Sequence, residues 1–316
     1  MKAYLHFIYA FASLLVLMIS CEPKPRLSPG EGYVEVPGGK IWYRIVGSGN
    51  KTPLLLLHGG PGFPSYYLNP MAELGKDRPV IFFDQLGCGR SGSEIDSTLM
   101  TTENYVEQLE QLRASLGLDE FYLYGHSWGT MLGMEYYLKH PENIKAMILA
   151  SPALSAPRWS EDAQKLIAKL PDSIQSAIKT ATDSSAFDTA EYEHAVNLFY
   201  ENFVIRKLPW DANIDSTFQG ANLSLYGYMW GPSEFTATGT LADYDRSASL
   251  GQIHVPTLYV CGEFDEALPE TVEFYKNQTP GAGMEVIEGA AHLTMHDKPE
   301  RNNEVVRSFL TELEKN

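Results

Sequence analysis

The stretch Phe121-Tyr-Leu-Tyr-Gly-His-Ser-Trp-Gly-Thr130 decides the fold of this chain. It begins as an apolar and aromatic run typical of a strand, passes through Gly-x-Ser-x-Gly, and continues into a helix-like segment, Met131 to Lys139. In a strand, turn and helix of this kind, the serine lies on a strained turn with its hydroxyl exposed at the edge of a sheet. The flanking glycines let strand and helix approach closely because they lack a Cβ atom. Ser127 is therefore the candidate nucleophile, and an ordinary tight turn is the alternative.

Strand-like runs and helix-like segments alternate on both sides of this stretch. The strand-like runs are short and rich in apolar or aromatic residues, and they occupy residues 32–36, 41–46, 53–57, 80–83, 146–150, 255–260 and 284–287. The helix-like segments occupy residues 102–117, residues 270–277 and a last segment that carries Val305, Val306, Phe309 and Leu310 on one face. This alternation predicts an α/β fold with a mostly parallel central sheet and helices on both faces.

Residues 151–247 interrupt the alternation. Three segments look helical there, Leu166 to Ile178, Ala190 to Ile205 and Ala221 to Trp230, and no strongly apolar strand occurs between them. We therefore expect a helical cap at 151–247, inserted into a core formed by residues 33–150 and 248–316.

The N-terminal residues have the character of an export signal. After Lys2, the apolar run from Ala3 to Ile19 is short for a membrane span, and residues 1–20 are typical of a signal peptide. The abrupt change to polar residues after Cys21 resembles a bacterial lipoprotein signal, in which that cysteine becomes the lipidated first residue. We expect residues 21–32 to be a linker in an exported, membrane-anchored lipoprotein that faces the periplasm or the cell exterior. A plain secretory signal and an uncleaved anchor are the alternatives.

Charge and cysteine content exclude other classes. The formal net charge of −16 lacks the basic face that nucleic acids need, so we expect no nucleic-acid partner. Solubility is the simplest explanation of the acidity, which also suits a protein that receives cationic ligands. Besides Cys21, the chain has Cys88 and Cys261 after two different strands, and we expect free, partly buried thiols. Neither cysteine is accompanied by a Cys-x-x-Cys or His-x-x-x-His spacing, and neither a metal nor an organic cofactor is expected.

Two polar residues follow the last two predicted strands. A serine hydroxyl becomes a useful nucleophile only when a base removes its proton and a third group orients that base. Asp265 follows the strand at 255–260, and His292 follows the strand at 284–287. The chain order Ser127, Asp265, His292 is that of the α/β-hydrolase triad, and all three lie at one edge of the sheet.

Other polar residues near these strands have competing interpretations. His296 lies four residues beyond His292 and is the alternative base, although we expect it at the start of the next helix. His126 should point away from the serine hydroxyl. We expect His58 to brace the glycine-rich loop that it precedes, and Asp84 to be a hydrogen-bonding brace after its own strand.

The loop His58-Gly-Gly-Pro-Gly62 directly follows a buried strand. Three glycines and a proline in five residues prevent regular structure and leave backbone N–H groups free to bind a ligand. We expect an oxyanion hole made by one N–H from Gly59 or Gly60 and by the N–H of Trp128.

Six motifs occur in order: His58-Gly-Gly-Pro-Gly62, Asp84-Gln-Leu-Gly-Cys-Gly-Arg-Ser91, Gly125-His-Ser-Trp-Gly129, Gly231-Pro-Ser-Glu-Phe-Thr-Ala-Thr-Gly-Thr240, Gly262-Glu-Phe-Asp-Glu266 and His292-Leu-Thr-Met295. Together they resemble the proline iminopeptidase (prolyl aminopeptidase) family of α/β-hydrolases and, within it, the tricorn-interacting aminopeptidases. The resemblance extends from about Gly32 to the C-terminus and implies the α/β-hydrolase fold with a helical cap.

The resemblance also implies roles for individual residues. It assigns the triad to the same three residues, and the oxyanion hole to Gly60 and Trp128. It implies that Glu234 and Glu266 bind the free α-amine of the substrate. Such a pair is physically reasonable, because a buried ammonium group needs carboxylate partners to offset its desolvation. For Glu234, a solvated carboxylate on the cap is the alternative.

The activity implied by the resemblance is that of a serine aminopeptidase. It would release an N-terminal residue, proline or a small apolar one, from short peptides with a free N-terminus, through an acyl-enzyme. An amino-acid amidase or an esterase on the same fold is the alternative, and a non-catalytic peptide-binding lipoprotein is an alternative of another class. Tyr226, Tyr228 and Trp230 in the cap are candidates to line a first-residue pocket, or to pack.

Overall fold

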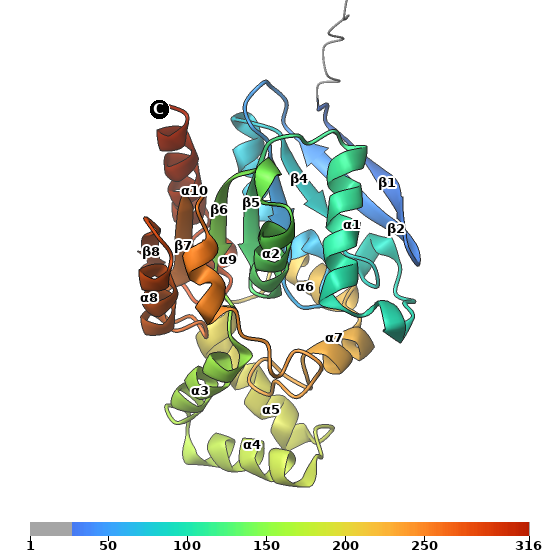
Figure 1. The fold of residues 1–316 in the computed structure, drawn as a ribbon. Helices are drawn as coiled ribbons and strands as arrows, with labels where there is room; N and C mark the ends of the chain where they lie inside the picture. The colour runs from blue at the N-terminus through green and yellow to red at the C-terminus, as the bar shows by residue number, and fades with distance from the viewer. Residues whose placement is uncertain (1–26, 316) are drawn as a thin grey trace, which may run out of the picture.

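The computed structural model describes residues 27–315, so the signal peptide and Cys21 expected from the sequence lie outside the described residues. Within that range, eight strands form one sheet in the order β1-β2-β4-β3-β5-β6-β7-β8 (Figure 1). The strands are β1 (Gly30–Val36), β2 (Gly39–Val46), β3 (Leu54–Leu57), β4 (Val80–Phe83), β5 (Phe121–His126), β6 (Ile144–Ala150), β7 (Thr257–Gly262) and β8 (Gly283–Ile287). The pairings of β2 with β1 and with β4 are antiparallel, and the other five pairings among the described strands are parallel. This confirms the predicted mostly parallel sheet.

The central strands are apolar along their whole length because both faces of the sheet are covered. In β3, Leu55 and Leu57 belong to the core on one face, and Leu54 and Leu56 belong to the core on the other. Successive side chains of a strand point to opposite faces, so a strand between two cores needs an uninterrupted apolar run. Because β3 to β8 run parallel, their carboxyl ends lie at one edge of the sheet.

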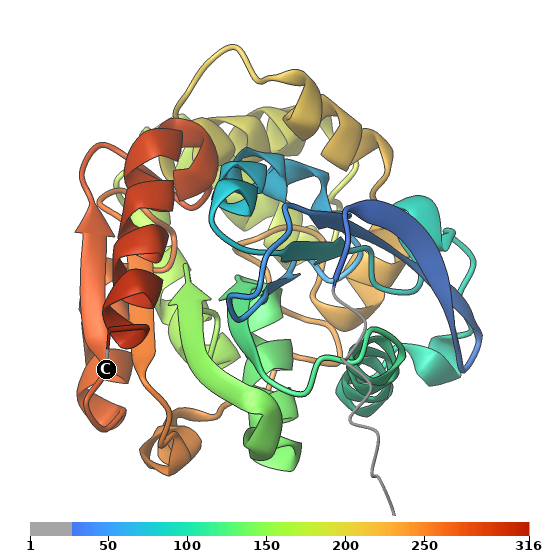
Figure 2. The same cartoon turned by 90° about the horizontal axis from the view of Figure 1, so that it is seen from above.

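Helices cover both faces of the sheet (Figures 1 and 2). One face packs against α1 (Thr102–Ser115), α2 (Trp128–Lys139) and α8 (Pro269–Gln278). The other face packs against the 3-10 segment η1 (Ser65–Lys76), α9 (Thr294–Asp297) and α10 (Pro299–Leu313). Shorter 3-10 turns are η2 (Gly89–Ser91), η3 (Ser97–Leu99), η4 (Pro141–Asn143) and η6 (Ser247–Gln252).

The chain between β6 and β7 forms a helical layer beyond one end of the sheet (Figure 1). Leu166, Ile174, Ile178, Tyr192 and Phe199 are buried there in a core of their own. We call this layer the cap, and it consists of α3 (Ala156–Ile167), α4 (Asp172–Ser184), α5 (Ala190–Phe199), the π-helical turn η5 (Tyr200–Val204), α6 (Ala212–Gln219) and α7 (Leu223–Met229).

Three element boundaries expected from the sequence are wrong. Leu166 to Ile178 is not one helix, because Pro171 has no N–H to donate and the chain leaves α3 before it and enters α4 after it. Residues 190–205 are α5 followed by a π-helical turn. The first strand begins at Gly30, inside the expected linker, because Gly30 already pairs with Ile45.

Two further observations bear on the N-terminal and cysteine predictions. Cys88 and Cys261 are free thiols, as predicted, and both are fully rather than partly buried. Across residues 27–315, no helix combines the length and the apolarity needed to cross a bilayer.

Candidate active site

Ser127 lies between β5 and α2 with φ 55° and ψ −124°. A positive φ is strained for a residue with a side chain, so the surrounding contacts must hold it. Its N–H donates to the Ala150 carbonyl of the neighbouring strand, with N and O 3.1 Å apart. A Cβ atom on Gly125 would lie 2.5 Å from the Gly129 carbonyl oxygen, so strand and helix can meet here only with glycine at this position. This is the sharp turn that the sequence predicted.

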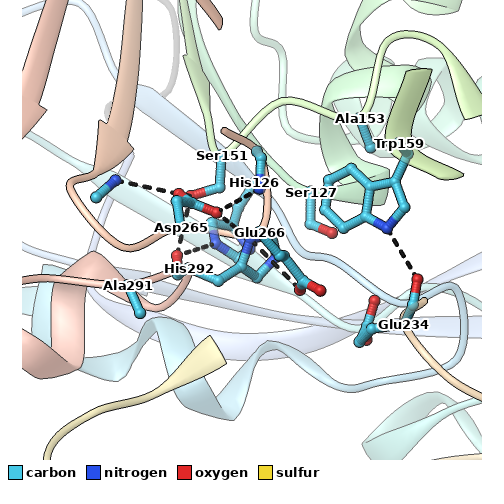
Figure 3. A network of polar contacts seen from close by, with 12 residues as sticks. His126, Ser127, Ser151, Ala153, Trp159, Glu234, Asp265, Glu266, Ala291 and His292 are labelled. Atoms are coloured by element: carbon cyan, nitrogen blue, oxygen red, sulfur yellow. Dashed lines mark hydrogen bonds and ion pairs between the residues drawn. The ribbon is translucent and has the colours of Figure 1, made fainter. Parts of the chain in front are cut away.

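Asp265 is buried and accepts hydrogen bonds on both carboxylate oxygens (Figure 3). Oδ2 accepts from the Ser151 hydroxyl at 2.7 Å and from the Gly262 N–H at 3.1 Å. Oδ1 accepts from the Ala267 N–H at 2.9 Å and lies 2.9 Å from Nδ1 of His292. An ionised carboxylate can only accept, so Nδ1 of His292 carries the proton and its Nε2 has a free lone pair.

His292 and Ser127 line the same cavity. The Trp159 ring meets the His292 ring edge to face, with centroids 5.6 Å apart, and restricts its rotation from the cap side. Among the described residues, no hydrogen bond joins the Ser127 hydroxyl to His292. Catalytic hydrogen bonds are often long or poorly aligned before substrate binds, so this geometry is compatible with a nucleophile and its base.

In the loop at residues 58–62, one backbone N–H is free to face the cavity and another is already hydrogen-bonded within the protein. Gly59 N–H donates to the Tyr67 hydroxyl at 2.5 Å, so it is already occupied. Within the described chain, neither Gly60 nor Trp128 has an acceptor for its N–H, and Trp128 begins α2, where no preceding helical carbonyl is available. Gly60, Trp128 and Ser127 line one small cavity together. Of the two glycines considered, Gly60 is therefore the one with a free donor.

Two further carboxylates lie beside this group (Figure 3). Glu266 is 1% exposed, and Oε1 lies 3.7 Å from Nδ1 of His292, beyond hydrogen-bond distance. Neither of its oxygens has a hydrogen-bond partner in the described structure. Glu234 lines the cavities around the serine, and its main-chain carbonyl accepts from the indole N–H groups of Trp159 at 2.8 Å and Trp230 at 3.2 Å. These two hydrogen bonds fix the main chain of Glu234 and so the position from which its side chain extends.

Burial shifts the titration of both glutamates. Desolvation raises the pKa of Glu266 well above its usual value, and the nearby carboxylates of Glu234 and Asp265 raise it further. Desolvation also raises the pKa of Glu234, while His292 opposes that shift. A bound cation would supply the charge partner that the two side chains lack. The site can thus bind a cationic group with carboxylates that lie near the Ser127 hydroxyl and His292.

The other histidines near the serine are fully engaged. His126 donates from Nε2 to the main-chain carbonyl of His292 at 3.0 Å and accepts at Nδ1 from the Tyr67 hydroxyl at 3.0 Å. Burial lowers the pKa of His126 well below its usual value. His296 lies in α9, where Nε2 donates to the Tyr67 carbonyl at 2.6 Å and Nδ1 lies 3.1 Å from the Asp211 carboxylate. Neither ring is available to take the serine proton.

The two predicted braces act as expected. His58 accepts the Gln85 N–H at Nε2 and donates from Nδ1 to the Gly59 carbonyl, with both distances 2.9 Å. It therefore joins the glycine loop to the loop after β4. Asp84 accepts from both the N–H and the hydroxyl of Ser65 and holds the start of η1.

Several residues of the site were not identified from the sequence. Ser151 follows β6 directly, so the reasoning that found Asp265 could have found it. Trp159 and Tyr67 come from helical segments and carry no local signal for their contacts with the site. Of the cap aromatics, Trp230 lines the small cavity, whereas Tyr228 is 46% exposed and lines neither cavity beside the serine.

Ser127 stands where two cavities meet. The larger, of about 490 Å³, is lined by Gly59, Gly60, Phe63, Tyr67, His126, Ser127, Tyr200, Val204, Ile214, Thr217, Phe218, Glu234, His292 and Leu293. The smaller, of about 190 Å³, is lined by Gly60, Ser127, Trp128, Met131, Ala153, Trp159, Trp230 and Glu234. Core and cap residues contribute to both, so the site lies between them.

Comparison with known proteins shows close relatives. The family model described as the alpha/beta hydrolase fold matches residues 52–299. The chain is 41% identical over 287 residues to a proline iminopeptidase from Heyndrickxia coagulans, covering 90% of this chain and 99% of the relative. It is 33% identical over 284 residues to a proline iminopeptidase from Thermoplasma volcanium, covering 89% and 96%.

Solved structures show the same likeness in three dimensions. The crystal structure of VinJ superposes with a TM-score of 0.87 at 33% identity, covering 90% of this chain and 100% of that one. The proline iminopeptidase from Mycobacterium smegmatis superposes with a TM-score of 0.83 at 29% identity, covering 90% and 98%. A match over nine tenths of the chain must include most of the cap as well as the sheet.

Proposed function

The chain belongs to the proline iminopeptidase family of alpha/beta hydrolases, and on that premise we propose that it is a serine aminopeptidase that releases an N-terminal proline or small apolar residue from short peptides. The observation that carries the proposal is a pair of carboxylates: Glu234, half-buried, lines the cavity with Ser127, and Glu266, fully buried and without a hydrogen-bond partner among the described residues, lies beside His292. A free α-amine is an ammonium group at neutral pH, and it can supply the hydrogen bonds and the charge that Glu266 lacks.

In the proposed acylation step, Nε2 of His292 accepts the proton of Ser127 while the serine oxygen attacks the carbonyl carbon of the first residue. Asp265 holds the ring in the tautomer that leaves Nε2 free. Negative charge develops on the carbonyl oxygen, and the N–H groups of Gly60 and Trp128 are the donors for it.

His292 also completes the proposed acylation step. The His292 imidazolium gives its proton to the nitrogen of the departing peptide as the carbon–nitrogen bond breaks. A water molecule then attacks the acyl-enzyme, with His292 again as base, and the free amino acid leaves. Every proton removed from a nucleophile is returned to a leaving group.

The carboxylate pair also accounts for removal of a single residue. An ammonium group held by Glu234 and Glu266 lies one Cα atom away from the carbonyl that Ser127 attacks. A longer N-terminal extension places its ammonium group elsewhere and leaves both carboxylates unpaired. The smaller cavity beside Trp128 then receives the side chain of the first residue, because Met131, Ala153 and Trp230 give it apolar surface.

A substrate panel tests this proposal. We expect hydrolysis of prolyl- and alanyl-naphthylamides, no hydrolysis of their N-acetylated forms, and only slow hydrolysis of simple esters. Rapid cleavage of amino-acid amides but not of peptides would favour the amidase, and rapid cleavage of simple esters would favour the esterase. A fluorophosphonate probe should label the protein but not its Ser127→Ala variant. Absence of labelling would favour the peptide-binding alternative.

We also propose that the mature protein is exported and anchored by lipid on Cys21, and that the residues between Cys21 and β1 act as a tether. The support is the sequence of the first 21 residues. Expression with the native signal should give a protein that partitions into detergent, whereas the Cys21→Ser variant should not. Equal partitioning of both proteins would contradict the anchor.

A further inference from the structure

The larger cavity is the place for the leaving group, an assignment that rests on the proposed aminopeptidase function. In that mechanism His292 gives a proton to the departing nitrogen, so the departing peptide must lie on the His292 side of Ser127. His292 lines the larger cavity and does not line the smaller one. Trp128, whose N–H faces the carbonyl oxygen in the mechanism, lines only the smaller one.

The wall of the larger cavity away from the triad is apolar. Val204 and Ile214 from the cap and Leu293 from the core supply aliphatic surface. At the mouth, Phe218 meets Phe63 edge to face with ring centroids 5.6 Å apart. Apolar atoms of a substrate's second residue would therefore leave water for a surface made of aliphatic and aromatic carbon.

Most polar side chains of this wall are already hydrogen-bonded, and among the described residues the Tyr200 hydroxyl is an exception. The Thr217 hydroxyl donates to the Asn213 carbonyl at 2.7 Å. The Tyr67 hydroxyl and both His126 nitrogens are used in the hydrogen bonds described above, which leaves that imidazole neutral. A polar second side chain would therefore find few free partners there.

The cavity also lacks a cation for a carboxylate. None of the described residues that line it is a lysine or an arginine, and Glu234 adds negative charge. The whole chain carries a formal charge of −16, which repels anions at longer range. In a free dipeptide the terminal carboxylate lies within the second residue itself, so its desolvation would not be offset.

We propose that this cavity selects leaving groups that begin with an apolar residue and whose first carboxyl group is blocked, by an amide or by continuation of the peptide. The substrates would then be tripeptides and longer peptides, or peptide amides, with an apolar second residue. Free dipeptides and peptides with a charged second residue would be poor substrates.

The substrate test compares prolyl-leucine amide with prolyl-leucine and with prolyl-glycine amide. We expect kcat/KM for prolyl-leucine amide to exceed each of the other two by about tenfold or more, the scale of burying one apolar side chain or of leaving one carboxylate without a partner. Equal values for all three, with cleavage observed, would overturn the leaving-group inference and leave the aminopeptidase function standing. Cleavage of none would overturn both.

A charge placed at the mouth makes the test specific to this cavity. Phe218 is 38% exposed, so the ammonium group of a Phe218→Lys variant can stay solvated while it reaches a bound carboxylate. We expect the preference for prolyl-leucine amide over prolyl-leucine to shrink severalfold. Leu223→Lys is the matched control, because Leu223 is 67% exposed on α7 and lines neither cavity.

The melting temperature of each variant shows whether a change in substrate preference comes from the cavity or from misfolding. A Phe218→Lys protein with the melting temperature of the parent and an unchanged preference would overturn the assignment of the cavity. An equal shrinkage in Leu223→Lys would show a general charge effect and would overturn it as well. If Phe218→Lys does not fold, the three substrate ratios of the parent protein still decide the proposal.

Discussion

Asp265 and Glu266 are neighbours in the chain and are almost equally buried, at 0% and 1% exposed, yet their surroundings are opposite. The Asp265 carboxylate accepts from a hydroxyl and two backbone N–H groups and pairs with His292. The Glu266 carboxylate accepts no hydrogen bond from the described protein. A buried carboxylate with permanent partners holds another side chain in place, whereas one without partners suits a ligand that brings its own donors.

The largest effect expected from this comparison follows removal of the Asp265 charge. Asp265→Asn should lower kcat by about 10⁴-fold, the scale seen in serine protease triads, because an amide can donate to His292 and favour the wrong tautomer. Steady-state kinetics on a prolyl-naphthylamide measure it, with KM expected to change little. A kcat within tenfold of the parent would remove Asp265 from the triad.

Glu266→Gln should instead weaken substrate binding. Losing a charged hydrogen bond to the ammonium group should lower kcat/KM by roughly 10- to 100-fold, since such bonds contribute about 1.5–3 kcal/mol. The loss should appear mainly in KM for free-amine substrates. Labelling by a small neutral fluorophosphonate should be unchanged, because that reaction needs no ammonium group. Equal losses in both assays would instead indicate damage to the triad.

The pH dependence of KM sharpens the comparison further. Only the ionised glutamates attract an ammonium group, and burial raises the pKa values of both Glu266 and Glu234. Protonation on acidification therefore begins at a higher pH than for exposed glutamates. KM for free-amine substrates should rise as pH falls through these raised pKa values, by up to about tenfold per pH unit for one carboxylate.

A neutral probe and a variant provide the controls for the pH profile. The rate of fluorophosphonate labelling should not show the change at acidic pH that arises from weaker binding of the substrate amine. In the Glu266→Gln variant, KM should no longer show the rise at acidic pH that is caused by protonation of Glu266. An unchanged KM profile in this variant would contradict the role of Glu266 in binding.

The smallest effect expected is that of Ser151→Ala. This change removes one of the four protein donors to Asp265 and leaves His292 and two backbone N–H groups in place. One hydrogen bond contributes about 1 kcal/mol, so kcat should fall by roughly fivefold with KM unchanged. A Ser151→Thr variant that keeps the hydroxyl should recover part of the loss. No change in kcat would mean that Asp265 does not need this contact.

Much of the fold followed from local patterns. The apolar runs at 53–57 and 80–83 are typical of strands that are buried on both faces of a sheet, and β3 and β4 are present there. The changed rhythm after Ala150 predicted helices, and helices follow β6. Pro171 also indicates a helix break in the sequence, because it has no N–H to donate, and the prediction of one helix from Leu166 to Ile178 is wrong for that reason.

The sequence by itself determined which residues could form a triad. Ser127, Asp265 and His292 each follow a strand, and the ends of parallel strands meet at one edge, so local spacing was sufficient to select them. Only the tertiary structure decided how Asp265 differs from Glu266, and where the two cavities lie. Those features depend on Ser151, on Trp159 and on the cap between β6 and β7. Contacts between segments that are far apart in the chain produce no periodic pattern in the sequence, so only the tertiary structure shows them.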